Sequence, residues 1–181
     1  AAAPAPAAPE EPAEPEEAPK PAKQPRPISK TQELINAVHS TIGSITHKAS
    51  PAAGVVLHPG ALTSFDEDGY PSTRTVIPSF IADDLTEVRI SSQAGTRKEA
   101  EIGANPKVSL HFQDQRGKGG WVTLKGPAAM VPGSSALQVD IVLKPLRCEV
   151  MSYVEDIMGD DDGWKPATMV LAGGESWRRV H

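Results

Sequence analysis

Two basic residues stand at the predicted start of a helix, where the helix dipole disfavours them. Thr96 and Glu99 have the spacing of a capping box, which predicts a helix that begins at about Arg97. The first turn of a helix carries roughly half a positive charge, so Arg97 and Lys98 would be repelled there. A bound anion would remove the conflict, because free backbone N–H groups, the dipole and both side chains could contact it together. The pattern therefore favours a phosphate site, and the alternative is an ordinary solvated Arg-Lys pair.

The elements on either side of these cations would position them. Residues 87–92 predict a strand that ends in Ser91 and Ser92, whose small hydroxyl side chains leave room for a ligand. The helix is expected to span residues 97–104, because Asn105-Pro106 stops it.

Most of the remaining chain predicts short strands. A helix over residues 29–48, with Ser29 and Gln32 as its capping box, precedes them. We interpret the glycine-rich loop 116–120 as a hairpin loop and residues 160–163 as a solvated acidic turn, so no metal site is expected. The expected strands are residues 61–65, 73–81, 88–91, 108–112, 121–124, 139–143, 146–154, 168–171 and 177–180. This succession indicates an all-β barrel with one or two helices.

Three motifs lie in order along about residues 55–131. Residues 68–76 read DGYPSTRTV, residues 95–112 read GTRKEAEIGANPKVSLHF, and residues 121–128 read WVTLKGPA. They resemble the D-G-x-P-x-x-R-x-V, G-S-R-K-x-x-x-I-x-x-N-P-x-V-S-L-x-F and V-x-x-x-G-x-A segments of the pyridoxamine 5'-phosphate oxidase-like flavoproteins. The resemblance implies a mostly β fold, a six-stranded split β-barrel with an N-terminal helix and one short helix.

The resemblance also implies a cofactor and a partner, namely flavin mononucleotide (FMN) bound between the subunits of a homodimer. It assigns Arg74 to the phosphate and ribityl chain of the flavin, with an exposed strand arginine as the alternative. The backbone around Val76 would lie against the isoalloxazine ring. The residues implied in cofactor binding are Arg74, Thr75, Val76, Ile77, Ser91, Ser92, Thr96, Arg97 and Lys98.

Some positions depart from the pyridoxamine phosphate oxidases themselves. Pro78-Ser79 follows Ile77 where those enzymes carry a lysine, and their glutamine falls at Gly120 or Trp121. Their C-terminal W-x-G-G-x-x-R-L-H-x-R signature is only echoed by residues 173–181, GGESWRRVH. No general acid or base stands out, so the substrate is unknown. The leading hypothesis is an FMN-dependent oxidoreductase of this family that does not oxidise vitamin B6.

A second hypothesis is a non-catalytic accessory subunit of a larger assembly that reuses the barrel, because a fold does not determine function. The missing substrate signature and the Pro/Ala/Glu-rich segment 1–27 favour it. A deazaflavin- or haem-binding split barrel is a third reading.

Composition predicts an extended tail over residues 1–27 and one domain over residues 28–181. A net charge of −5, without a basic stripe, gives no reason to expect nucleic-acid binding. No apolar stretch is long enough for a transmembrane segment. The chain begins at Ala1, which is typical of a processed precursor or a trimmed chain, and removal of a targeting peptide would place the protein in a plastid or mitochondrion.

Overall fold

The structure is a computed structural model that describes residues 30–46, 48–50, 55–114, 119–153, 157, 165–173 and 176–180. Several sequence features lie outside these residues. They are the tail 1–27, the Ser29 cap, His47, Pro51, most of the glycine-rich loop 116–120, the acidic turn 160–163, and Gly174, Glu175 and His181 of the C-terminal echo.

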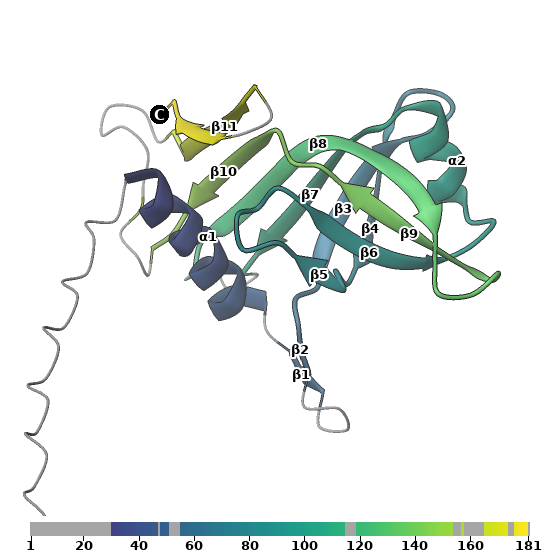
Figure 1. The fold of residues 1–181 in the computed structure, drawn as a ribbon, viewed down its shortest axis with the longest axis horizontal. Coiled ribbons are helices and arrows are strands. Elements are labelled where there is room, and N and C mark those ends of the chain that lie inside the picture. Colours follow the sequence, from purple (N-terminus) through teal and green to yellow (C-terminus); the bar gives the residue numbers. More distant parts are fainter. Residues whose placement is uncertain are drawn as a thin grey trace, which may run out of the picture.

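The described chain consists of two helices and twelve strands (Figure 1). In chain order they are α1 (Lys30–Thr46), β1 (Lys48–Ser50), β2 (Val55–Leu57), β3 (Gly60–Phe65), β4 (Pro71–Val76), β5 (Phe80–Ile81), β6 (Val88–Gln93), α2 (Arg97–Ala104), β7 (Lys107–Gln113), β8 (Trp121–Pro132), β9 (Gln138–Leu143), β10 (Arg147–Met151), β11 (Ala167–Ala172) and β12 (Ser176–Arg179).

Antiparallel pairing joins six of the strands into one curved path. The order is β4-β3-β7-β8-β9-β6, and within the described residues no pairing connects β4 with β6. The barrel is therefore split between these two strands. A second branch, β10-β11-β12, extends from β8. This mostly β split barrel with two helices confirms the predicted fold class.

The strand β8 belongs to both branches because it changes partner along its length. Its first half pairs with β10 and its second half pairs with β9, while β7 lies along its other edge. The change occurs at Gly126, where a Cβ atom would lie 2.0 Å from the carbonyl oxygen of Lys144. Only glycine allows the backbone of the β9–β10 connection to approach β8 so closely.

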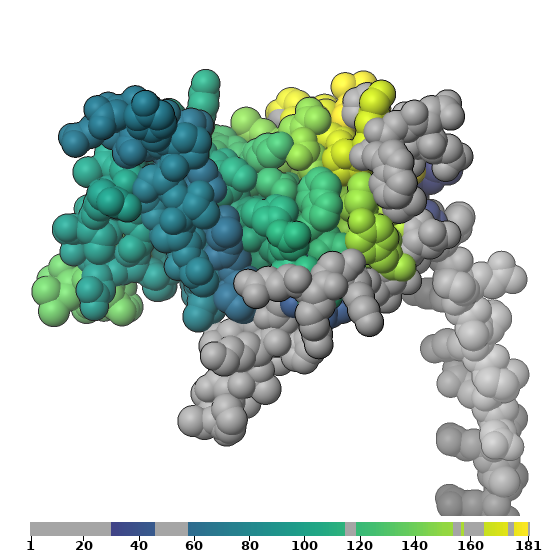
Figure 2. All heavy atoms as spheres, turned by 180° about the vertical axis from the view of Figure 1, so that it is seen from behind, coloured from purple at the N-terminus to yellow at the C-terminus, as the bar shows by residue number. Residues whose placement is uncertain are grey.

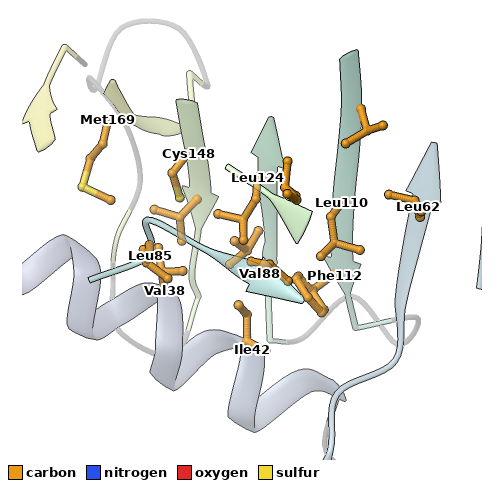
Figure 3. Close-up of a cluster of buried hydrophobic side chains, with 14 of the residues drawn as sticks. Val38, Ile42, Leu62, Leu85, Val88, Leu110, Phe112, Leu124, Cys148 and Met169 are labelled. Atoms are coloured by element: carbon orange, nitrogen blue, oxygen red, sulfur yellow. The ribbon is translucent and has the colours of Figure 1, made fainter. Parts of the chain in front are cut away.

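The core lies between the curved sheet and α1 (Figure 3). The apolar residues of α1 recur at helical spacing, so Leu34, Val38 and Ile42 are buried on one face. On the strands burial alternates with a period of two, as Leu110 and Phe112 of β7 show. The helix packs on β7, β8 and β12.

Two predicted boundaries are wrong. The strand expected at residues 73–81 is two strands, β4 and β5, because the chain leaves β3 after Val76 and joins β6. Pro78 has no N–H to continue a ladder, and the N–H of Ser79 already donates to the carbonyl of Arg89 at 2.8 Å. The strand expected at residues 121–124 extends to Pro132, because β9 supplies new partners beyond Gly126.

The turn between β5 and β6 is fixed by distant elements. Leu85 has a positive φ of 60° and is fully buried. Trp177 Nε1 of β12 donates to the carbonyl of Asp84 at 2.7 Å, and His39 Nε2 of α1 lies 3.1 Å from the carbonyl oxygen of Asp83.

Seen from behind, the blue β3–β4 turn and the light-green tip of the β8–β9 hairpin lie at one end of the molecule (Figure 2). The yellow C-terminal strands lie towards the other end. Neither described helix has the length and apolar character that a bilayer span requires.

Candidate anion-binding site

The N-terminus of α2 is left without a side-chain cap. Thr96 occupies the N-cap position in an extended conformation, but its hydroxyl makes no capping hydrogen bond. The Glu99 carboxylate instead accepts from the N–H of Gly95 at 2.7 Å, so the predicted capping box is only half formed. Thr96 Oγ1 is buried and has no hydrogen-bond partner. A buried hydroxyl in this state costs about 1–3 kcal/mol, which a polar ligand at the helix start would recover.

The two predicted cations lie in the first turn of α2, as expected. Arg97 is 79% exposed, and its Nε atom lies 3.0 Å from Oε1 of Glu101, one helical turn further on. Its Nη2 atom also donates to Ser72 Oγ at 3.3 Å. Lys98 is half-buried and makes no ion pair within the described part of the chain. Lys98 is therefore the cation that is available to an incoming anion without breaking a contact.

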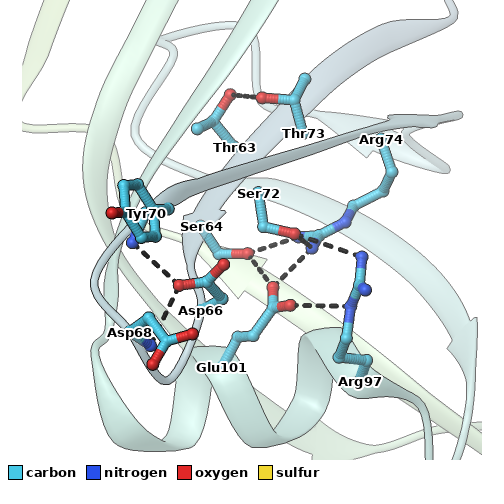
Figure 4. Close-up of polar contacts among 10 residues, drawn as sticks. All are labelled: Thr63, Ser64, Asp66, Asp68, Tyr70, Ser72, Thr73, Arg74, Arg97 and Glu101. Carbon is cyan, nitrogen blue, oxygen red and sulfur yellow. Dashed lines mark hydrogen bonds and ion pairs between the residues drawn. The ribbon is translucent and has the colours of Figure 1, made fainter.

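Arg74 belongs to a buried polar cluster that sequence reasoning missed (Figure 4). Its Nη2 atom donates to Glu101 Oε2 at 2.5 Å and to Ser72 Oγ at 2.7 Å, and its Nη1 atom donates to Ser64 Oγ. Ser64 in turn donates to the same Glu101 oxygen at 2.5 Å. Arg74 is therefore neither an exposed strand arginine nor a free cation, since an acidic residue of α2 neutralises it.

The Glu101 carboxylate remains charged in this cluster. Burial alone would raise the pKa of Glu101, but hydrogen bonds from Ser64 and Arg74 and the positive charge of Arg74 together hold the pKa below its ordinary value.

Strand register explains why these residues meet. Ser64 pairs with Ser72, and Leu62 pairs with Arg74, so all four side chains point to the inner face of the β3–β4 ladder. Glu101 lies on the buried face of α2 beside Ile102. The spacing of Arg97 and Glu101 was the one signal of this cluster in the sequence, because residues four apart on a helix are neighbours.

The other predicted site residues divide between two faces. Val76 is buried inside the barrel, Thr75 points outward, and Ile77 lies beyond the end of β4 and is exposed. On β6, Ser91 points outward and donates to Asp140 Oδ1 at 2.8 Å. Ser92 shares the inner face with Ile90 and precedes the turn to α2.

A cleft of about 400 Å³ lies beside the cluster, between the β3–β4 turn and α2. Phe65, Ala100 and Ala104 form its apolar part, while Asp66, Glu67 and Asp68 line the opposite wall. Three carboxylates make this cleft unfavourable for an anion. The N-terminus of α2 is the better place for one.

The site motifs fall inside a recognised family. The sequence profile of the pyridoxamine 5'-phosphate oxidase family matches residues 57–157, which contain β4, β6 and α2. The chain belongs to this family. No match was found among curated proteins.

Solved structures of this family have the same fold. A general stress protein 26-related protein from Clostridium acetobutylicum, of the pyridoxinephosphate oxidase family, has a TM-score of 0.57 at 12% identity over 77% of this chain and 96% of that chain. An FMN-binding, pyridoxamine 5'-phosphate oxidase-related protein from Nostoc punctiforme has a TM-score of 0.55 at 8% identity, covering 82% and 95%. PhzG from Burkholderia lata, solved with tetrahydrophenazine-1-carboxylic acid, has a TM-score of 0.54 at 13% identity, covering 82% and 87%. At these identities the likeness is one of fold.

Proposed function

We propose that the protein binds FMN, with the phosphate at the N-terminus of α2. The observation that carries the proposal is the uncapped helix start with the unpaired Thr96 hydroxyl, followed directly by Arg97 and Lys98. Backbone N–H groups, a hydroxyl donor and two cations are the groups that hold a phosphate dianion. A flavin-binding relative with the same fold, the protein from Nostoc punctiforme, adds support.

The other contacts follow the course of the chain. Ser92 precedes the turn that leads into α2 and has the hydroxyl nearer the barrel interior, so we assign it to the phosphate ahead of Ser91. The backbone from Thr75 to Ile77 would lie along the isoalloxazine ring. Arg74 adds positive charge from the barrel wall, and Glu101 reduces that charge.

The proposed activity is that of a small flavin-dependent oxidoreductase. FMN would supply the hydride or electron chemistry, and the protein would bind the phosphate and shield one face of the ring. His111 does not serve as a free base, because its Nδ1 atom lies 2.8 Å from the Thr123 hydroxyl and its ring packs at 5.9 Å from that of Trp121. The substrate class therefore has to come from the ring's surroundings, which a second subunit would complete in a homodimer.

One observation favours the accessory-subunit alternative. Glu101 neutralises both arginines of the site, which is the state expected of a barrel that no longer needs a phosphate. Native mass spectrometry of the protein from its source distinguishes the two functions, because a stable place in a multi-subunit particle without flavin supports the accessory role.

The direct test is the colour and the flavin content of the purified protein. We expect a yellow protein that releases FMN on denaturation, identified by chromatography against FMN, FAD and riboflavin. The apoprotein should quench FMN fluorescence on titration and should bind riboflavin far more weakly, since riboflavin has no phosphate. Equal affinity for FMN and riboflavin would place the phosphate outside the protein and contradict the assignment.

A further inference from the structure

The Glu101 carboxylate is the one group of the cluster to which the proposed function gives no task. It is 5% exposed and lies between two arginines. Its Oε2 atom accepts from Ser64 and Arg74, whereas Oε1 is ion-paired to Arg97 without a hydrogen bond. A carboxylate and a phosphate have charges of the same sign. Glu101 therefore competes with any incoming phosphate for the same guanidinium groups.

The two arginines differ in how firmly Glu101 holds them. The Arg74 side chain is 20% exposed and donates to three oxygens of the barrel wall and α2. The Arg97 side chain is 79% exposed and has only the 3.0 Å contact to Glu101 and a long hydrogen bond to Ser72. An exposed ion pair between residues four apart on a helix is weak, whereas a buried, hydrogen-bonded pair is costly to separate.

We propose that Glu101 sets the phosphate affinity of this site by retaining Arg74 and releasing Arg97. A phosphate dianion draws the Arg97 guanidinium away from Glu101 to the N-terminus of α2, where Lys98 and Thr96 also contact the anion. Arg74 stays with Glu101 and acts as a positioning residue. This inference rests on the proposed function, because it concerns the same phosphate.

The test compares Glu101→Gln with Glu67→Gln. Glutamine keeps the shape of Glu101 and one hydrogen-bond acceptor but removes the charge that holds Arg97. Glu67 is an exposed residue of the adjacent turn and contacts neither arginine, so its variant controls for the general loss of one negative charge. We expect Glu101→Gln to tighten FMN binding by about tenfold. Riboflavin affinity should not change, and Glu67→Gln should stay within about twofold of the parent.

Failure of the proposed function is distinguishable from failure of this inference. If the parent protein binds no FMN, the same three proteins are titrated with inorganic pyrophosphate by calorimetry, which asks only whether the cations take an anion. Tighter binding by Glu101→Gln than by Glu67→Gln supports the inference even then. Equal binding by the two variants, with either probe, overturns it.

A measurement on the parent protein makes the test independent of whether Glu101→Gln folds. Arginine Nε–H resonances are recorded by NMR with and without FMN, or pyrophosphate, and Arg97→Lys provides the assignment. We expect the Arg97 resonance to shift and the Arg74 resonance to stay in place. A shift of Arg74 that equals or exceeds that of Arg97 contradicts the division of labour between the two arginines.

Discussion

The two cations of α2 carry the phosphate assignment, so their removal is the sharpest test of it. Each charge-assisted contact to phosphate is worth about 1.5–3 kcal/mol, so Arg97→Ala with Lys98→Ala should weaken FMN binding by about two to four powers of ten. Both side chains lie outside the core. Only the exposed pair with Glu101 is lost, at about 0.2–0.5 kcal/mol.

Fluorescence titration with FMN measures this loss, and thermal unfolding checks that the fold is intact. Lys107→Ala is the matched control, because Lys107 is an exposed cation at the start of β7. A double variant that binds FMN like its parent would show that the anion lies elsewhere.

The Glu101 cluster should also leave a signature in acid. The pKa of Glu101 is below its ordinary value of 4.5 in the folded protein, so its carboxylate stabilises the fold above that pH. This stabilisation is lost as the pH falls through the lowered pKa. At neutral pH, Glu101→Gln should lower the free energy of unfolding by about 1–3 kcal/mol, because Arg74 loses its counter-ion.

Urea unfolding of parent and variant, from neutral pH to well below pH 4.5, measures the effect. The difference between the two proteins should shrink as the solution becomes more acidic. A difference that stays constant with pH would mean that Glu101 contributes by shape alone.

Among the elements, β8 depends on a single glycine. In Gly126→Ala the new Cβ would lie 2.0 Å from the Lys144 carbonyl, so the backbone of β8 or of the β9–β10 connection must move. We expect a loss of about 2–3 kcal/mol, which corresponds to a fall in melting temperature of about 5–10 °C.

Gly103→Ala provides the opposite result in the same protein. Gly103 lies in α2 with open space around it, and alanine there should stabilise the helix by about 0.5–1 kcal/mol. Calorimetry of both variants gives the comparison. If Gly126→Ala melts with Gly103→Ala, the close approach at β8 is not a constraint.

The same elements show which parts of the structure local sequence can predict. Thr96 and Asn105-Pro106 predicted the bounds of α2 correctly, because caps and proline act on neighbouring residues. The length of β8 was underestimated, because its second half depends on β9, a partner that no local pattern identifies. The cluster around Glu101 was missed for the same reason: Ser64, Arg74 and Glu101 come from three elements that only the tertiary fold brings together.

Across the protein, α1 should affect stability without affecting the site. Ile42 is 2% exposed, and α1 packs on β7, β8 and β12. Ile42→Ala should lower the free energy of unfolding by about 2–4 kcal/mol and leave the FMN affinity of the folded protein unchanged. Asn36→Ala, on the exposed face of α1, should change stability by less than about 0.5 kcal/mol. A drop in FMN affinity for Ile42→Ala, measured well below its melting temperature, would connect α1 to the site.

The domain boundary predicted from composition is testable by truncation. Residues 1–27 contain mainly alanine, proline and glutamate and offer little to bury. A chain that starts at residue 28 should therefore melt within about 2 °C of the parent. A larger fall would place part of this segment in the folded unit.

The order of strand pairing has a consequence for the speed of folding. β3 pairs with β7, and β6 pairs with β9, so that Ala61 meets His111 and Val88 meets Leu143. These two long-range pairings are interleaved along the chain, and neither can be completed as a local hairpin. Loop closure must therefore precede most of the contacts that reward it, which is typical of β proteins that fold in about milliseconds to seconds. Until β9 is in place, β6 has an open edge, and a variant that weakens β9 should promote aggregation before it alters the finished fold.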